Sequence, residues 1–429
     1  MIRSLRTGVS GLKSSQVRMD VVGNNIANVN TAAFKRSRAA FGEVMGQQML
    51  GVGRLSGGTG VNPAFVGLGV AVQSIDKNWG QGSLESTGVQ TDLALAGDGF
   101  FIARNGDQQM LTRAGNFTFN SEGKLVTANG MEVQGWSFDG EGQLVTGELQ
   151  DVMFDPTTTV AARASSNAVI TGNLPQQFAL PDPAATPPVP GESTAISTVL
   201  YDSQGAPHDI TITFEKTADN QWTYAASVAA GADDPFGGNL PSGTLEFDVD
   251  GQLLNVDGNT DPLSSTFNWD NNFASLDPAG NTRTMTLDFS KMTQFDASDT
   301  AVVSQADGSS SGSLDGYAID SSGILTLNFT NGQQRQVFQL AVGNVNNPNG
   351  LEMQGENMYV AGGASGDLQV GRAGRDLRTN VVAGSLEMSN VDLATEFTEM
   401  IVSQRGYQAA ARIVTTSDEL LQETVSLKR

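Results

Sequence analysis

The feature that most constrains this chain is a heptad pattern at each of its two ends. Apolar residues recur every three or four positions in residues 1–27 and again from Ser389–Asn390 onward, which predicts two amphipathic helices. Between them, short apolar runs alternate with Gly and Asn turn signals, which predicts β-structure. Because both stripes are narrow and suit helix-on-helix packing, we expect the two ends of the chain to lie together.

Each predicted helix also keeps one glutamine within its apolar stripe. A polar residue in such a stripe typically sets register or oligomeric state at some cost in stability. The first stripe consists of Ile2, Leu5, Val9, Leu12, Gln16, Met19 and Ile26. The second consists of Leu393, Phe397, Met400, Gln404, Tyr407, Ala411, Val414, Leu421 and Val425. The stripes could pair within one molecule, dock on a β core, or join neighbouring molecules; the glycines that weaken the first helix favour joining.

The second helix has several candidate capping residues at its start. Ser389 or Asn390 is expected to serve as the N-cap, and Asp392 favours the first turn through the helix dipole.

Charge divides unevenly along the chain. The whole sequence carries 46 acidic and 24 basic residues, a formal charge of −22, which argues against nucleic-acid binding. Residues 1–40 nevertheless hold seven basic residues and one acid, whereas 387–429 are net acidic. The two predicted helices are therefore electrostatic complements.

A membrane-surface role for the first helix is disfavoured by its narrow, aromatic-poor apolar face, and no apolar run in the sequence reaches membrane-spanning length.

The pattern predicts a mainly β, multidomain chain with helical termini. Residues 1–27 with 386–429 form a coiled-coil domain, and 28–75 form an extended, Gly-rich connecting arm. Residues 76–150 pair with 301–385 as a split β domain. The strongly acidic stretch 151–300 is an inserted outer β domain.

The sequence offers few residues of the types that form catalytic or metal sites. There is no cysteine and one histidine, His208, which is expected in a solvated turn before a strand. The stretch 248–262 resembles a calcium loop but lacks the spacing and the terminal Glu of an EF-hand, so hairpin turns are the better interpretation. No catalytic site, metal or cofactor is therefore expected.

An amide-rich segment follows the first helix directly. Asn24, Asn25, Asn28 and Asn30 lie within seven residues, and the segment continues to Phe34 and Lys35. Asparagine is poor inside helices and strands but suits helix ends and turns. These amides are expected to end the helix, Phe34 to anchor the following arm, and Lys35, Arg36 and Arg38 to meet acidic neighbours.

Three ordered blocks resemble the rod and hook family of bacterial flagellar axial proteins. The first is LRTGVSGLKSSQVRMDVVGNNIANVNTAAFKR, with its NNIAN-x-NT-x-x-FK core. The second is TDLALAGDGFFI with LTRAGNFTFNSEGKLVTANGMEVQGW. The third is the C-terminal GSLEMSNVDLATEFTEMIVSQRGYQAAARIVTTSDELLQETVSLKR. Within the family, the length and the large insert after Trp136 resemble the hook branch.

The resemblance implies a structural subunit that polymerises into a flexible, curved tube, a universal joint that passes motor torque to the filament. The implied partners are further copies of the chain, the rod, hook-cap and hook–filament junction proteins, and the flagellar type III export apparatus. The expected location is the basal body and extracellular hook, without a cleaved signal peptide, since the N-terminus lacks an apolar leader region. The rivals are a distal rod subunit and a secreted β-domain binding module or adhesin; an enzyme is disfavoured.

Overall fold

The computed structural model describes residues 2–44, 46–50, 64–182, 184, 189–228, 240–260, 262–268 and 284–426. It divides the chain into two compact units. Unit 1 contains 1–156, 317–327 and 335–429, and unit 2 contains 157–316 and 328–334. The predicted fold class is confirmed, because the structure is mainly β with one helix at each end. The four-part division with its boundaries stays a prediction.

The elements of unit 1 include both helices. They are α1 (Ile2–Ala27), β1 (Ser37–Glu43), β2 (Gln47–Leu50), β3 (Ala64–Val66), β4 (Val70–Lys77), β5 (Leu84–Ser86), β6 (Leu93–Ala96), β7 (Phe100–Asn105), β8 (Gln108–Thr112), β9 (Thr118–Phe119), β10 (Leu125–Val126), β11 (Glu132–Ser137), β12 (Gln150–Asp151), the 3-10 helix η2 (Pro348–Gly350), β26 (Glu352–Gly355), β27 (Met358–Val360), β28 (Gln369–Arg372), β29 (Asn380–Ala383), β30 (Ser385–Glu387) and α2 (Leu393–Ser426).

The elements of unit 2 are strands. They are β13 (Thr159–Val160), β14 (Asn167–Pro175), β15 (Ser193–Tyr201), β16 (Pro207–Ala218), β17 (Gln221–Val228), β18 (Ser242–Phe247), β19 (Leu253–Val256), β20 (Ser264–Asn268), β21 (Thr284–Phe295) and β22 (Val302–Ala306). Three further strands have residues in both units: β23 (Gly312–Ile319), β24 (Ile324–Phe329) and β25 (Gln334–Asn344).

The sheet of unit 1 is covered on both faces. Its order runs β25-β11-β7-β8-β27-β26, and the pairs along this path are antiparallel. Strand β7 reads Phe-Phe-Ile-Ala, and all four side chains are buried. Phe101 packs with Leu93 and Phe117 in one apolar cluster, while Phe100 and Ile102 belong to another. A strand that is apolar at consecutive positions is buried on both sides, as here.

Unit 2 is a two-sheet β structure with a shared core. One sheet has the order β15-β16-β17-β18-β19 and the other β20-β21-β14-β22. Burial alternates along β16, so Ile210, Ile212 and Phe214 face inward. They share one apolar cluster with Leu287 and Phe289 of the second sheet. The alternation follows the period of two that a strand imposes on its side chains.

The expectation for His208 is wrong in its surroundings. His208 lies within β16 and is only 9% exposed, with Nε2 3.5 Å from Asp202 Oδ2. It is not a solvated turn residue, because the strand begins one residue earlier than the Gly-Ala-Pro turn signal indicates. In the calcium-like stretch, Asp248 Oδ1 accepts hydrogen bonds from the backbone N–H groups of Asp250 and Gln252, which is turn chemistry.

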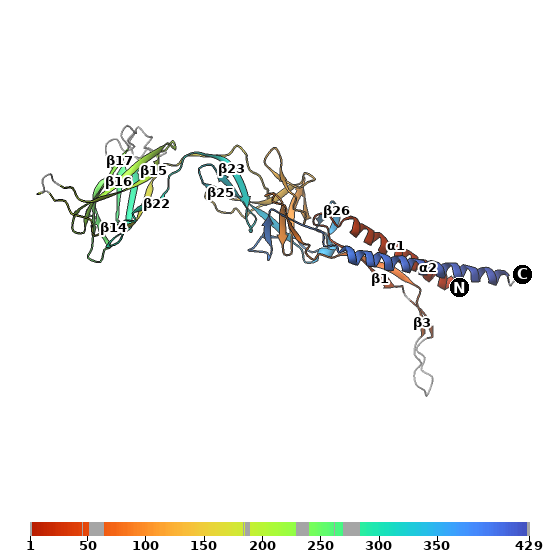
Figure 1. The fold of residues 1–429 in the computed structure, drawn as a ribbon. Coiled ribbons are helices and arrows are strands. Elements are labelled where there is room, and N and C mark those ends of the chain that lie inside the picture. The colour runs from red at the N-terminus through yellow and green to blue at the C-terminus, as the bar shows by residue number, and fades with distance from the viewer. Residues whose placement is uncertain are drawn as a thin grey trace, which may run out of the picture. The chain divides into compact units, whose positions relative to one another are not determined.

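The described part of the predicted arm, 28–75, is paired rather than simply extended. β1 pairs with β4 and β2 with β3, both antiparallel. Both β1 and β4 lie against α1, and Figure 1 shows β1 close to the helices. The weak periodicity of this Gly-rich stretch concealed the pairing, because the strands lie on a helix instead of filling a β core.

Candidate functional site

The two helices pack antiparallel through small side chains. Figure 1 shows α1 and α2 side by side. The buried residues of α2 recur every seven positions, at Glu396, Ser403, Ala410 and Ser417. Ser417 Oγ lies 3.4 Å from Ser4 Oγ, and Gly8 and Gly11 of α1 face Val414 and Ala410. Small residues let the two backbones approach closely, so this seam holds the pair together within one molecule.

The predicted stripes lie mostly beside this seam, although Val414 of the second stripe faces Gly8 within it. Several stripe residues follow a seam residue by one position: Val9 follows Gly8, Leu12 follows Gly11, Phe397 follows Glu396 and Gln404 follows Ser403. Others in α2 follow a seam residue by four positions, as Met400 follows Glu396, and lie closer to the seam. One residue rotates a helix by about 100°. In an antiparallel pair, the next residue along each chain turns toward the same side of the pair. The residues that follow the seam on α1 and on α2 therefore lie on one side. They therefore make one continuous face beside the seam.

Much of this face is open to solvent in the single chain. Val9, Leu393, Phe397, Tyr407 and Val425 are exposed. Both glutamines are exposed too, so neither Gln16 nor Gln404 lies in the intramolecular seam. The remaining stripe residues are half-buried: Leu5, Leu12, Met19, Ile26, Met400, Ala411, Val414 and Leu421. The side chain of Ile2 lies outside the described residues.

α2 carries further exposed apolar residues that the sequence reasoning missed. Ile401 is 58% exposed, Val402 56% and Leu420 52%, and Ile413 is also exposed. Val402 precedes the seam residue Ser403 by one position, and Leu420 follows Ser417 by three, so both lie on the opposite flank from the predicted stripe. The sequence does indicate this second apolar surface, because these four residues are apolar and lie outside the heptad register. A helix that is apolar on several sides is normally buried, so α2 lacks part of its covering in the monomer.

Two glycines of α1 give a direct test of the seam. A Cβ added at Gly8 would lie 2.9 Å from Val414 Cγ2, whereas one at Gly23 would meet nothing within 4 Å. Gly8→Val is therefore expected to lower the free energy of unfolding by about 1–3 kcal/mol through overpacking. Gly23→Ala, the matched control, should raise it by up to about 1 kcal/mol. Denaturant unfolding followed by circular dichroism measures both, and a Gly8→Val protein as stable as the parent contradicts this seam.

The asparagine segment ends α1 as the sequence predicted. Asn28 donates its side-chain N–H to the backbone carbonyl of Asn24 at 2.9 Å, and Thr31 Oγ1 donates to Asn28 Oδ1 at 3.1 Å. These bonds satisfy a helix-end carbonyl and fix the turn that follows. Asn30 lies exposed in that turn. The amides thus complete the helix end locally.

Asn25 has a longer-range role. Its buried amide exchanges two hydrogen bonds with the backbone of Ser37, at 2.8 and 2.9 Å, where β1 begins. The same Nδ2 donates to Glu396 Oε2 at 3.1 Å. One side chain therefore joins α1, β1 and the first turn of α2.

Glu387 gathers three segments of unit 1 around a buried carboxylate. Its Oε1 accepts from Lys35 Nζ at 2.7 Å and from the backbone N–H of Gly82 at 2.8 Å, and its Oε2 accepts from Arg113 at 3.3 Å. Glu387 is 1% exposed and so is Lys35. Burial lowers the pKa of Lys35 and of Arg113, although the Glu387 charge opposes this in both. We call these residues, Lys35, Arg113 and Glu387, the junction cluster.

Neighbouring contacts complete the junction. Phe34 is buried, and Lys77 Nζ lies 5.6 Å from the centre of its ring. Arg36 forms ion pairs with Glu396 and, at 2.9 Å, with Glu399. Of Lys35, Arg36 and Arg38, which were expected to meet acidic neighbours, the first two form ion pairs. Arg38 lies opposite Asp76 in the β1–β4 pairing.

The predicted N-cap of α2 is wrong. Asp392 caps the helix, since its Oδ1 accepts from the backbone N–H of Ala394 at 3.0 Å. Hydrogen bonds from Thr395 and Ala394 lower the pKa of Asp392. Asn390 instead accepts from the backbone N–H of Arg36 and donates to the carbonyls of Asn78 and Gly80. Asn390 is therefore used to join segments, and the helix begins at Leu393.

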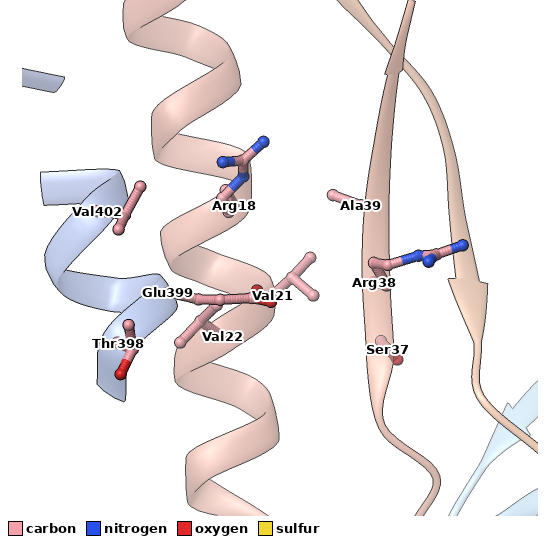
Figure 2. Close-up of a pocket in the computed structure, with 9 residues that line it drawn as sticks. All are labelled: Arg18, Val21, Val22, Ser37, Arg38, Ala39, Thr398, Glu399 and Val402. Atoms are coloured by element: carbon pink, nitrogen blue, oxygen red, sulfur yellow. The ribbon is translucent and has the colours of Figure 1, made fainter. Parts of the chain in front are cut away.

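A groove lies where α1, β1 and α2 meet (Figure 2), and has a volume of about 280 Å³. Val22 and Val402 line it from the two helices, and Ala39 lines it from β1. Arg18 and Arg38 also line it. Among the residues that the structure describes, no group of three or more His, Asp or Glu is placed to hold a metal ion, and no helix has the length and apolar character needed to cross a membrane.

Family models match most of this chain in four ranges, and they define a class. Their descriptions are flagella basal body rod protein for residues 5–35, flagellar hook protein FlgE/F/G D1 domain for 94–171, flagellar basal body protein FlaE D2 domain for 173–309, and flagellar basal body rod FlgEFG protein C-terminal for 382–427. The chain is thus similar to flagellar rod and hook proteins at both helices, at the junction and in the β units.

Relatives that match over their full length narrow the class from rod and hook proteins to hook proteins. Flagellar hook protein FlgE of Treponema pallidum is 36% identical over 465 residues, and that of Borreliella burgdorferi is 36% identical over 449, each covering 100% of both chains. FlgE of Salmonella typhimurium is 31% identical, covering 99% of this chain and 100% of its own. The chain belongs to the flagellar hook protein family, as a structural subunit of the hook.

A solved structure agrees at the level of fold. The crystal structure of Helicobacter pylori flagellar hook protein FlgE2 superposes with a TM-score of 0.50 at 14% identity, covering 71% of this chain and 100% of that chain.

Proposed function

We propose that this hook subunit polymerises into a flexible, curved tube through the exposed apolar faces of its terminal helices. The observation that carries the proposal is the exposure of α2, whose Phe397, Ile401 and Leu420 are each at least half exposed and lie on different sides of the helix. Two flanks of one helix need covering, so more than one neighbouring copy is required. The predicted stripes supply one covering surface and the Val402 flank another.

The division of labour between parts follows from their surfaces. Dry apolar helix contacts hold neighbouring subunits in place, whereas charged, solvated β surfaces exchange contacts at little cost in free energy. The stretch 151–300 holds 20 acidic residues against four basic ones, which suits it to the outside of a tube that bends while it rotates. We therefore infer a universal joint that transmits motor torque to the filament and serves swimming motility.

The remaining expectations belong to the same proposal. The subunit is exported by the flagellar type III apparatus and works in the extracellular hook of the basal body, where it meets rod, hook-cap and hook–filament junction proteins. It acts mechanically and not as an enzyme. Similarity to full-length hook proteins and to the D2 domain over residues 173–309 supports the hook subunit over a distal rod subunit and over an adhesin.

Two exposed side chains of α2 test the assembly surface. Phe397→Ser with Ile401→Ser is expected to leave the monomer folded but to raise the critical concentration for polymerisation about 100-fold. Burying two large apolar side chains contributes about 3 kcal/mol, and 1.4 kcal/mol is a factor of ten. Met353→Ser is the matched control, since Met353 is 62% exposed on β26. Pelleting assays across protein concentration measure the effect; unchanged assembly of the double variant counts against this surface.

A further inference from the structure

The groove in Figure 2 combines an apolar lining with positive charge. Val21, Val22 and Val402 provide the apolar part. Arg18 leaves α1 beside it, and Arg38 leaves β1 on the side away from α1. The guanidinium of Arg18 lies 4.8 Å from the centre of the Phe41 ring, which holds it beside β1.

The acid in this groove is already neutralised. Glu399 lines the groove, but its Oε1 is paired with Arg36 NH2 at 2.9 Å. The charge left for a partner is therefore that of Arg18, because Arg38 extends away from α1 and lies opposite Asp76 in the β1–β4 pairing. An occupant that matches the groove needs an apolar side chain with a carboxylate beside it.

The last turns of α2 present that combination at the other end of the helix pair. Ser417 lies opposite Ser4, so α2 continues for nine residues beyond the pair, to Ser426. Only Ile2 and Arg3 of the described α1 precede Ser4. Within this end, Leu420 is 52% exposed, and Glu419 and Glu423, both exposed, lie one turn apart beside it. We call Asp418–Ser426 the α2 tail.

We propose that the α2 tail of one copy docks in the groove of a second copy, with Leu420 against the valines and Glu423 facing Arg18. The inference rests on the proposed function, because the contact joins two subunits of the polymer. The tail residues that make the contact, Leu420 and Glu423, are not part of the predicted stripes.

The position of the two surfaces sets the kind of contact. Groove and tail are different patches near opposite ends of one helix pair, so a contact between them is head to tail. Such a heterologous contact leaves a free groove at one end of each row and a free tail at the other. It therefore continues as an open polymer rather than closing as a dimer.

Introduced cysteines test the contact, because the chain has none of its own. Ala39→Cys and Leu420→Cys are made in separate chains, mixed, polymerised and treated with a short thiol crosslinker. The expected product is a covalent heterodimer, with no dimer from either variant alone. Gln108→Cys, in an exposed hairpin, mixed with Leu420→Cys is the matched control and should give none.

Charge exchange in the same chains tests the glutamate–arginine contact. Arg18→Glu in the Ala39→Cys chain should reduce the heterodimer yield several-fold, and Glu423→Arg in the Leu420→Cys chain should restore it. Lys13→Glu, at an exposed position of α1 outside the groove lining, is the control. Normal tubes without heterodimers overturn this inference while the proposed function stands. A parent chain that forms no tubes overturns the proposed function itself. Dimers from Ala39→Cys alone show a symmetric contact and also overturn the inference.

Discussion

Replacing Glu387 with Ala is expected to lower the free energy of unfolding of unit 1 by about 3–5 kcal/mol, since removing one partner of a buried ion pair leaves the other charge uncompensated. Two cations, Lys35 and Arg113, lose their shared carboxylate, and the backbone N–H of Gly82 loses its acceptor. Lys35 keeps the Gly80 carbonyl and Arg113 keeps the Gly97 carbonyl, so neither is left without any hydrogen bond.

Two further variants separate charge from shape. Glu387→Gln retains an acceptor for the backbone N–H of Gly82, so its free energy of unfolding should lie between those of the parent and the Ala variant. Glu85→Gln, at an exposed position of β5, should change stability by no more than about 0.5 kcal/mol. Denaturant unfolding gives all three values. A Glu387→Ala protein within about 1 kcal/mol of the parent would falsify the claim that the junction cluster stabilises unit 1 by joining its segments.

The junction cluster also shows why one part of the site could be predicted and another could not. Lys35 and the asparagines lie in a local motif, so their residue types indicate a helix end followed by a charged contact. The acidic partner is 352 residues away in sequence. No periodicity connects such positions, because their meeting is decided by how β30 is placed beside the segment that follows α1.

The helices illustrate a second limit. Periodicity predicted α1 at residues 1–27, against Ile2–Ala27 in the structure, and it predicted both apolar stripes. It did not predict that a parallel series of small residues, one position earlier, forms the intramolecular seam. From sequence alone, glycine is a weak helix former. In the structure, Gly8 lets Val414 of α2 pack directly against α1, because it has no side chain. Close backbone approach is a tertiary property that helix propensity does not contain.

Capping shows a third limit. Ser389, Asn390 and Asp392 are all acceptable at a helix start, and propensity alone does not rank them in context. Asn390 is taken by three backbone partners from other segments, which leaves Asp392 for the cap. His208 lies buried within β16, although the preceding turn signal indicated a solvated position.

Removing the terminal helices is expected to abolish polymerisation completely, because both proposed contacts lie on them. The β core of unit 1 and the core of unit 2 have their own apolar clusters, so they should remain folded without the helices.

Assembly through the exposed faces of the terminal helices is tested most directly by comparing the full chain with one lacking residues 1–27 and 390–429. The two are compared by sedimentation and negative-stain imaging in polymerising salt. Tubes from the full chain and folded monomers from the truncated chain are the expected result. If both samples stay monomeric while the full chain already has its helices folded, the helices serve only to pack within one molecule, and assembly through their exposed faces is contradicted.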